Sequence, residues 1–392
     1  MKYFIYKYSP KTIGLTPQDN LKVIVPRSKV EEYLKLGFNK ISIIHLKNLT
    51  FYSLISFFRT EQKLELIEEI FTLDESLMSD IGLLSSIFTS GIKGTESKLF
   101  FKDKYYMRSI LNGIVKQPRI FEEWDITQLP KQGIIKPRRS EAGKGVFIYN
   151  TKDALQKDLR FLTKDTDQVL IEELVDYEVM LSCDGIVSNG KLIYAFVHEY
   201  IGKITEISEK NINIKRTASY YWKNPKVINA IIQNSQKVVD YLGDKNDTYP
   251  IHFEWFYSEK KNELIFCEGA CRFGGARIPF LIEDAFGLNI LSKYWEVKFN
   301  KNIENKKVFF PKNIASSFLA FNDGKKQLIN FNTELIKLKE YSQYTKIGTI
   351  SEPKNNSSDI KFLIRFTSID EEEFTENIKK IKQEIFHIHS PI

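Results

Sequence analysis

Two glutamates, Glu254 and Glu268, occupy a stretch that reads as two strands joined by a polar turn, HFEWFYSEKKNELIFCEGACRFGG. A turn centred on Lys261 places them directly across from each other, because each lies seven residues from that lysine. Alternation along the second strand puts Leu264, Phe266 and Glu268 on one face. Side chains opposed in this way have Cβ atoms about 5 Å apart. Two bare carboxylates at that range repel by about 3 kcal/mol at an effective dielectric near 20.

A divalent cation held between the two carboxylates would offset this repulsion. Mg²⁺ in particular binds one or two carboxylates and completes its shell with substrate phosphates. The alternative is a different strand register, in which both carboxylates reach solvent. The hairpin alone leaves both interpretations open.

The residues that follow the second glutamate, GACRFGGARIP, favour an anionic ligand. Arg272 could present a two-pronged donor to a phosphate or carboxylate. Gly274 and Gly275 would let the backbone approach a ligand closely, and Arg277 could bind a carboxylate. Taken alone, Arg272 could form a surface ion pair and the two glycines an ordinary turn. The occurrence of all these residues beside the two glutamates favours a ligand-binding site.

A second candidate is the stretch GIIKPRRSEAGKGVFIYN, where Lys136 ends a strand and Ser140, Gly143, Lys144 and Gly145 form a loop. It is not a Walker loop, because the first glycine is wrongly spaced and Gly145 stands where Ser or Thr is required. A strand, a glycine loop and a second strand could instead cover phosphates as a flap, using backbone N–H groups and lysine charge. A plain β-hairpin is the alternative.

A third candidate is the acidic strand end in VLIEELVDYEVMLSCDGIV. Glu172, Glu173 and the backbone near Leu174 could hydrogen-bond an adenine edge, and Glu178 could accept from ribose hydroxyls. The alternative is a strand end exposed to solvent. His198 and Arg216, further along, are weaker candidates for the acceptor side of a site.

The elements that must position these residues follow a clear order. Residues 1–95 alternate strand-like runs (KYFIY, LKVIV, KISIIH) with helix-like stretches at Val30–Lys35 and Asp80–Phe88, which predicts a parallel α/β layer. Further predicted elements are a helix at Lys102–Leu111, several strands from Gly133 onward, a helix at Pro225–Leu242, a short helix that Gly287 ends, strands near VFFP, SSFLAF and KFLIRF, and a final helix at about Glu371–Ile385.

Composition narrows the class of protein. The chain has 392 residues, of which 42% are hydrophobic, and this composition predicts a globular protein. Its net charge of +7 comes from scattered lysines, so the sequence contains no basic stripe that would bind nucleic acid. Its three cysteines indicate a reducing compartment and no disulfide framework, and a zinc site at Cys267 and Cys271 has no second ligand pair. No apolar run approaches 18 residues. We therefore expect a cytoplasmic protein with no membrane partner.

Taken in order from DKYYMR, beginning at Asp103, to GARIP, ending at Pro279, these motifs resemble the ATP-grasp superfamily, and within it the carboxylate–amine ligases such as L-amino-acid ligases. The resemblance implies an α/β (α+β) chain with the ATP-grasp fold. Its parts would be a Rossmann-like N-terminal domain over residues 1–95, an ATP-grasp domain over 96–300 with a lid at about 115–178, and a C-terminal lobe over 301–392.

The resemblance also implies roles for the candidate residues. Ala270 departs from the pattern, because the family places a third metal ligand, an asparagine, two residues after the second glutamate; the interval from Glu172 to Glu178 is one residue short. The implied roles are nucleotide binding by Lys104, Lys136, Ser140, Gly143, Lys144, Gly145, Glu172, Glu173, Leu174 and Glu178, Mg²⁺ binding by Glu254 and Glu268, catalysis by Arg272 and Lys136, and substrate binding by Arg272, Gly274, Gly275 and Arg277.

By the same resemblance, the protein uses ATP with Mg²⁺, or Mn²⁺, to form an amide or peptide bond through an acyl-phosphate, releasing ADP and phosphate. Its partners would be a small carboxylate and an amine, with a homodimer possible. Two alternatives share the fold: a kinase or carboxylase of a small molecule, and a non-catalytic nucleotide-binding protein, which Ala270 favours. A nucleic-acid binder is suggested only by the basic pI.

Overall fold

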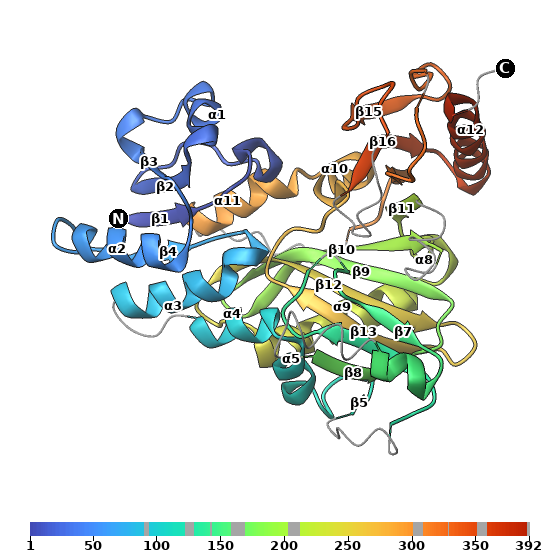
Figure 1. The fold of residues 1–392 in the computed structure, drawn as a ribbon, viewed down its shortest axis with the longest axis horizontal. Helices are drawn as coiled ribbons and strands as arrows, with labels where there is room; N and C mark the ends of the chain where they lie inside the picture. Colours follow the sequence, from blue (N-terminus) through green and yellow to red (C-terminus); the bar gives the residue numbers. More distant parts are fainter. Residues whose placement is uncertain are drawn as a thin grey trace.

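The computed structural model describes residues 1–392 except 90–93, 122–128, 142, 158–168, 203–211, 301–308, 328, 351–358 and 390–392. Three lobes surround a common centre (Figure 1). None of the described helices is both long and apolar enough to cross a membrane.

The N-terminal lobe is the predicted parallel α/β layer. Its four strands are ordered β3-β2-β1-β4 and pair in parallel. Parallel neighbours require crossover connections, and helices supply them here. The elements are β1 (Lys2–Ile5), β2 (Leu21–Pro26), α1 (Val30–Lys35), β3 (Ile43–Leu46), α2 (Phe51–Glu61), β4 (Glu69–Phe71), the short 3₁₀ helix η4 (Glu75–Leu77) and α3 (Met78–Phe88).

Two short helices lead from this lobe to the rest of the chain: α4 (Thr95–Lys102) and α5 (Lys104–Ile110). The predicted single helix from Lys102 is wrong at its start, because Asp103 leaves the helical conformation, with φ −100° and ψ 109°. Its carboxylate accepts from the backbone N–H of Tyr105 at 3.0 Å and so caps α5.

A small antiparallel sheet, which we call the lid sheet, lies at the bottom of Figure 1. Its strands are ordered β5-β8-β6-β7. They are β5 (Ile120–Phe121), β6 (Gly133–Pro137), β7 (Phe147–Tyr149) and β8 (Val169–Glu173). The glycine loop predicted as a flap connects β6 to β7, and Ala142 within it lies outside the described residues.

The largest element is an eight-stranded antiparallel sheet, ordered β13-β12-β9-β10-β11-β14-β16-β15. The C-terminal strands therefore continue this main sheet. No strand forms at Phe309–Pro311, the described part of the predicted VFFP strand; the strand begins at Ile314. The strands are β9 (Val179–Ser188), β10 (Lys191–Ile201), β11 (Ile212–Thr217), β12 (Thr248–Ser258), β13 (Glu263–Ala270), β14 (Ile314–Phe321), β15 (Leu338–Gln343) and β16 (Ile360–Ser368).

Helix α9 (Pro225–Leu242) packs on the main sheet and ends where the sequence predicts. Proline fits the first turn because that position needs no N–H donor. The apolar side chains at Val227, Ile231 and Val238 are buried, as helical spacing requires. The remaining helices are α8 (Tyr220–Lys223), α10 (Ile278–Phe286), α11 (Ile290–Asn300) and α12 (Glu371–His389).

Candidate active site

The hairpin of β12 and β13 brings Glu254 and Glu268 opposite each other, as predicted. The way in which the two strands reach this register differs from the predicted symmetric turn. Ser258 pairs with Glu263 across a four-residue turn, and this register alone would set Glu254 against Cys267. The register shifts between Glu254 and Trp255, so Cys267 is an extra residue, a β-bulge. The bulge moves Glu268 onto the face that Glu254 occupies.

The predicted shared face of Phe266 and Glu268 is therefore wrong. Phe266 is fully buried in the core, with its ring 5.0 Å from that of Trp255. Glu268 faces the other way, with a side chain 40% exposed. A bulge inserts one extra residue, so the alternation of faces on one side of it is shifted relative to the other side.

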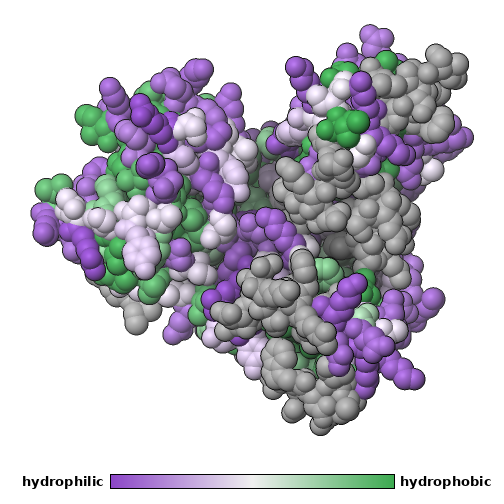
Figure 2. Space-filling view, in the orientation of Figure 1, coloured by the Kyte–Doolittle hydropathy of each residue, from purple (hydrophilic) through white to green (hydrophobic). Residues whose placement is uncertain are grey.

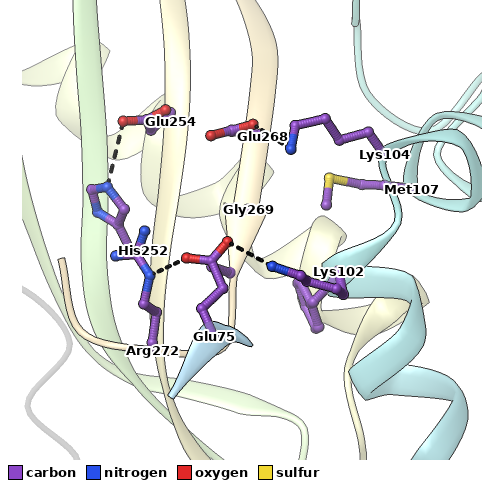
Figure 3. A pocket seen from close by; sticks show the side chains of 11 residues that line it. Glu75, Lys102, Lys104, Met107, His252, Glu254, Glu268, Gly269 and Arg272 are labelled. Atoms are coloured by element: carbon purple, nitrogen blue, oxygen red, sulfur yellow. Dashed lines mark hydrogen bonds and ion pairs between the residues drawn. The ribbon is translucent and has the colours of Figure 1, made fainter. Parts of the chain in front are cut away.

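The two glutamates line a small pocket to which three parts of the chain contribute (Figure 3). The N-terminal lobe supplies a glutamate, helices α4 and α5 supply two lysines and two apolar residues, and β12, β13 and the segment directly after β13 supply the rest. Hydrophilic residues gather at the centre of the face shown in Figure 2. The lining residues with charged or titratable side chains are Glu75, Lys102, Lys104, His252, Glu254, Glu268 and Arg272.

Glu254 is held in its ionised form. The Tyr200 hydroxyl donates to its carboxylate at 2.5 Å, and His252 Nε2 lies 3.5 Å from Oε1. Burial alone raises the pKa of Glu254, but His252, Lys215 and Tyr200 together lower it to about 2. The carboxylate is therefore charged at neutral pH and available to a cation.

Glu268 and Lys104 form the opposite wall of the pocket. Lys104 Nζ lies 3.4 Å from Glu268 Oε2 and donates to the backbone oxygen of Ser140 at 2.8 Å. Burial opposes the charge of Lys104, yet Glu268 and Glu75 raise its pKa. The predicted phosphate-binding lysine thus touches both a predicted metal ligand and the start of the glycine loop.

Arg272 also points into the pocket, where Glu75 of η4 holds it (Figure 3). Nε donates to Glu75 Oε2 at 2.5 Å, and Nη1 donates to the Phe273 oxygen at 2.9 Å. Lys102 Nζ lies 3.7 Å from the other oxygen of Glu75. Despite burial, the charges of Arg272 and Lys102 lower the pKa of Glu75. The sequence gives no local signal for Glu75, because it lies almost 200 residues from Arg272 and reaches it only through the fold.

Lys215 of β11 is a second residue that the sequence does not single out. It is buried, its Nζ lies 4.3 Å from the ring centre of Tyr200, and the charges of Glu254 and Arg272 act on it. Burial lowers its pKa to about 8, although Glu254 and Asp184 oppose the shift. An isolated lysine within a strand resembles any exposed lysine until the strand is placed beside the site.

The donor set fits Mg²⁺ through two carboxylates. Within the described ranges, no three side chains of His, Cys, Asp or Glu gather closely enough to hold an ion by themselves. Glu254 and Glu268 are nevertheless paired on one face, and Mg²⁺ needs only one or two carboxylates when phosphates complete its shell. Ala270, which pairs with His252, offers no side-chain ligand.

The weaker candidates, His198 and Arg216, lie in different parts of the structure and have different partners. His198 is fully buried, with Nδ1 3.0 Å from Asp184, the same carboxylate that His252 Nδ1 contacts at 2.7 Å. Arg216 pairs with Glu199 and with Glu371 of α12. Arg216 therefore links the C-terminal helix to the main sheet by ion pairs. His198 instead belongs to a hydrogen-bonded network with Asp184 and His252, which we call the network beneath the pocket.

Of the residues predicted to hold adenine, Glu172 already forms ion pairs within the protein. It is buried, with Oε1 2.8 Å from Arg108 Nε and Oε2 2.6 Å from Lys136 Nζ. Burial raises its pKa, but the two cations lower it overall. Glu173 is exposed and accepts from the Arg119 N–H at 3.2 Å. Glu172 therefore orients Lys136 through their ion pair. Neither Glu172 nor Glu173 lines the pocket.

Replacing Glu172 by glutamine will destabilise the protein by about 3–5 kcal/mol, because Arg108 and Lys136 would remain buried with their shared counter-charge removed. Urea denaturation of both proteins measures this difference. Glu173→Gln is the matched control on the same strand and should change stability little. Equal midpoints for Glu172→Gln and wild type would contradict the assignment.

Glu178 does not reach the pocket. Its carboxylate accepts from the Glu259 N–H at 2.9 Å and lies 3.3 Å from Lys260 Nζ, both in the turn of the β12–β13 hairpin. In the glycine loop, Gly143 and Gly145 both have a φ of 71°. Glycine adopts that left-handed backbone without steric cost.

The predicted substrate loop packs against the network beneath the pocket. A Cβ on Gly274 would come within 2.5 Å of Asp184 Oδ1 and 2.9 Å of His252 Nδ1, whereas a Cβ on Gly275 meets nothing within 4 Å. Arg277 donates to Glu340 of β15 at 2.6 Å. Gly274 is therefore required by close packing, and Arg277 is already paired.

Gly274→Ala should displace the loop that carries Arg272 and reduce turnover about 10-fold or more, because misplacing a reacting group by about 1 Å can cost up to about 100-fold. Gly275→Ala is its matched control and should keep near wild-type activity, since space is open there. The measurement is the catalytic rate of both variants. Equal rates would contradict the packing argument.

No family model matches this sequence, and no curated protein matches it. Solved structures do match. The L-amino acid ligase from Bacillus licheniformis gives a TM-score of 0.73 at 14% identity, covering 98% of this chain and 97% of its own. N5-carboxyaminoimidazole synthetase from Staphylococcus aureus, complexed with ADP, gives 0.66 at 15% identity, covering 97% and 96%. The biotin carboxylase domain of the Hydrogenobacter thermophilus 2-oxoglutarate carboxylase, in complex with MgADP, ADP and bicarbonate, gives 0.68 at 10% identity, covering 97% and 89%.

These matches cover nearly all of this chain, so the N-terminal lobe, the lid sheet and the main sheet agree as a whole and not through one motif. The identities are low, and what the matches establish is architecture. The protein has the ATP-grasp fold that its sequence motifs resemble.

Proposed function

We propose that this protein is an ATP- and Mg²⁺-dependent ligase that joins the carboxylate of an amino acid or small peptide to an amine, releasing ADP and phosphate. The observation that carries the proposal is the pairing of Glu254 with Glu268 on one face of the sheet, beside Lys104 and Arg272. The likeness to an L-amino acid ligase supports an amino acid as the acid substrate.

A carboxylate does not react with an amine unaided, because its oxygen is a poor leaving group. Transfer of the γ-phosphoryl group from ATP to the carboxylate makes phosphate the leaving group, and the protein's part is positioning and charge stabilisation. The amine then attacks the acyl carbon: the C–N bond forms, the C–O bond to phosphate breaks, and the amine's proton passes to solvent. This route requires no covalent enzyme nucleophile.

The residues of the pocket suit this sequence of steps. Glu254 and Glu268 would hold Mg²⁺, which neutralises charge on the β- and γ-phosphates. Lys104 and Lys136 would contact the phosphates, and Arg272 would stabilise the transferring group. The glycine loop from Ser140 to Gly145 would shield the acyl-phosphate from water. Gly274 and Gly275 would shape the acid's site, and the backbone near Leu174 would meet the adenine.

The proposal is tested by incubating the protein with ATP, Mg²⁺ and pools of amino acids, small acids and amines. We expect ADP, not AMP, in a one-to-one ratio with an amide that mass spectrometry identifies. A phosphorylated acid as the end product would indicate a kinase, and dependence on bicarbonate would indicate a carboxylase. ATP binding without ADP formation in any pool would overturn the enzymatic proposal.

A further inference from the structure

Asp103, between α4 and α5, is the most completely enclosed carboxylate near the proposed phosphate site. Its exposure is 0%. Besides capping α5, it accepts from Arg138 Nε and Nη2, both at 2.9 Å, and from Arg139 Nε at 3.0 Å. The fork-to-carboxylate geometry of Arg138 is the strong, directional kind of ion pair.

The helix cap does not account for the negative charge. An asparagine caps a helix about as well as an aspartate, because the cap needs only an acceptor oxygen. A buried carboxylate is costly unless it is paired, and here two guanidinium groups supply the pairing. The charge therefore serves the contact with Arg138 and Arg139, which follow directly after β6.

That contact joins the two lysines assigned to phosphate. Lys104 follows Asp103 in the chain, and its backbone N–H donates to the Arg138 oxygen at 3.0 Å. Lys136 lies two residues before Arg138 on β6. Lys104 also reaches Ser140, beyond the arginines, at 2.8 Å. One buried carboxylate thus sets the N-terminus of α5 against the end of β6, with a cation on each side.

Arg138 is held in this position from its other face as well. Its guanidinium lies 4.8 Å from the ring centre of Tyr105 and 5.1 Å from that of Tyr106. Cation–π contacts of this kind orient a guanidinium plane. Arg138 is therefore directed toward Asp103 and away from the pocket, where it does not compete for phosphate.

We infer that Asp103 is a positioning residue for nucleotide binding: through Arg138 and Arg139 it holds the N-terminus of α5, which carries Lys104, against the end of β6, which carries Lys136, without touching the ligand. This inference rests on the proposed function for the identity of the ligand. Asp103 would act through other residues, as the partners that orient metal ligands do; loss of such partners typically costs 10–100-fold in metal affinity or activity.

The test compares Asp103→Asn with wild type. Asparagine keeps the cap for Tyr105 and removes the charge that Arg138 and Arg139 pair with. We expect ATP affinity, measured by calorimetry with Mg²⁺, to fall about 10-fold, and the KM for ATP to rise with it, while the KM for the acid and the amine stays unchanged. A general loss of folded protein would instead lower the maximal rate and leave all three KM values unchanged, because KM does not depend on the amount of active enzyme.

Asp323→Asn is the matched control. It removes a carboxylate that pairs with buried Lys361 at 2.7 Å in the C-terminal part of the main sheet. Its ATP affinity should equal that of wild type. Arg138→Lys is a second test variant that keeps the positive charge but cannot form the fork; we expect a loss of about 3–10-fold.

The outcomes separate the inference from the proposed function. Unchanged ATP affinity in Asp103→Asn, or in Arg138→Lys should the first variant fail to fold, overturns the inference. A wild-type protein that binds ATP yet forms no amide overturns the proposed ligase only, because the affinity comparison still decides the role of Asp103. A wild-type protein that binds no ATP overturns both.

Discussion

Replacing Glu268 by glutamine will lower the rate of ADP formation at least about 100-fold and leave the fold intact. Glutamine has almost the same shape but no charge, so Glu254 would face Mg²⁺ alone. Loss of one preorganised electrostatic contact at a transferring group costs about 100–1,000-fold in kcat. Glu268→Gln also removes one counter-charge from buried Lys104, but Lys104 keeps the charge of Glu75 and its hydrogen bond to the Ser140 oxygen, so we expect a lower stability in a protein that still folds.

The measurement is a coupled assay of ADP at saturating ATP, with circular dichroism as the check on folding. Glu263→Gln is the matched control on the same strand, since Glu263 pairs with Lys116 at the surface. It should retain full activity. Turnover like that of wild type in Glu268→Gln would show that the carboxylate pair does not serve catalysis.

The pairing of these two glutamates was predictable from the sequence, but the reason for it was not. Counting from a symmetric turn gives the right partners, yet the turn is offset and the β-bulge at Cys267 corrects the register. Bulges depend on local backbone conformation that alternation of polar and apolar residues does not encode. The face of Phe266 was mispredicted for the same reason.

Residues that act on the site from a distance in the chain were not predictable. Glu75 carries no motif, and Lys215 lies on a strand whose neighbours only the sheet order defines. The sequence singles out Glu172 as an adenine contact, with a strand end exposed to solvent as the alternative, whereas the structure buries it between Arg108 and Lys136. Its partner Arg108 is 64 residues away, so the sequence could not show that the carboxylate is already neutralised.

The α/β alternation and the helix α9 were predictable because each rests on local signals: hydrophobic period, proline at the start and glycine at the end. The break between α4 and α5 was not, because Asp103 reads as an ordinary helical position until its arginine partners are known. Asp103 and Cys267, where the local structure departs from the regular pattern, are adjacent in sequence to Lys104 and Glu268 of the proposed site.

The second large effect is expected at Lys215, where activity and stability will move in opposite directions. Lys215→Met should abolish most ADP formation. The lysine is a further cation beside Glu254 and Arg272, where negative charge would build up during transfer of the phosphoryl group. It should also stabilise the protein at neutral pH. Burial has lowered the pKa of Lys215 from 10.5 to about 8, and a shift of this size corresponds to about 3 kcal/mol of cost for the charged form.

The pH dependence gives this prediction its sign. The folded pKa lies below the unfolded one, so between pH 8 and 10.5 the unfolded chain binds more protons and wild-type stability rises with pH. Below pH 8 the full cost remains. Methionine cannot titrate, so the advantage of Lys215→Met, measured by urea denaturation, should be about 3 kcal/mol at pH 7 and shrink toward zero by pH 10.5. Lys261→Met, in the exposed turn of the hairpin, should show no such trend. A Lys215→Met protein that is both active and no more stable than wild type at pH 7 would mean that the lysine is solvated and remote from the reaction. The charge of the transferring group would then be stabilised by Arg272, Lys104 and Lys136 without Lys215.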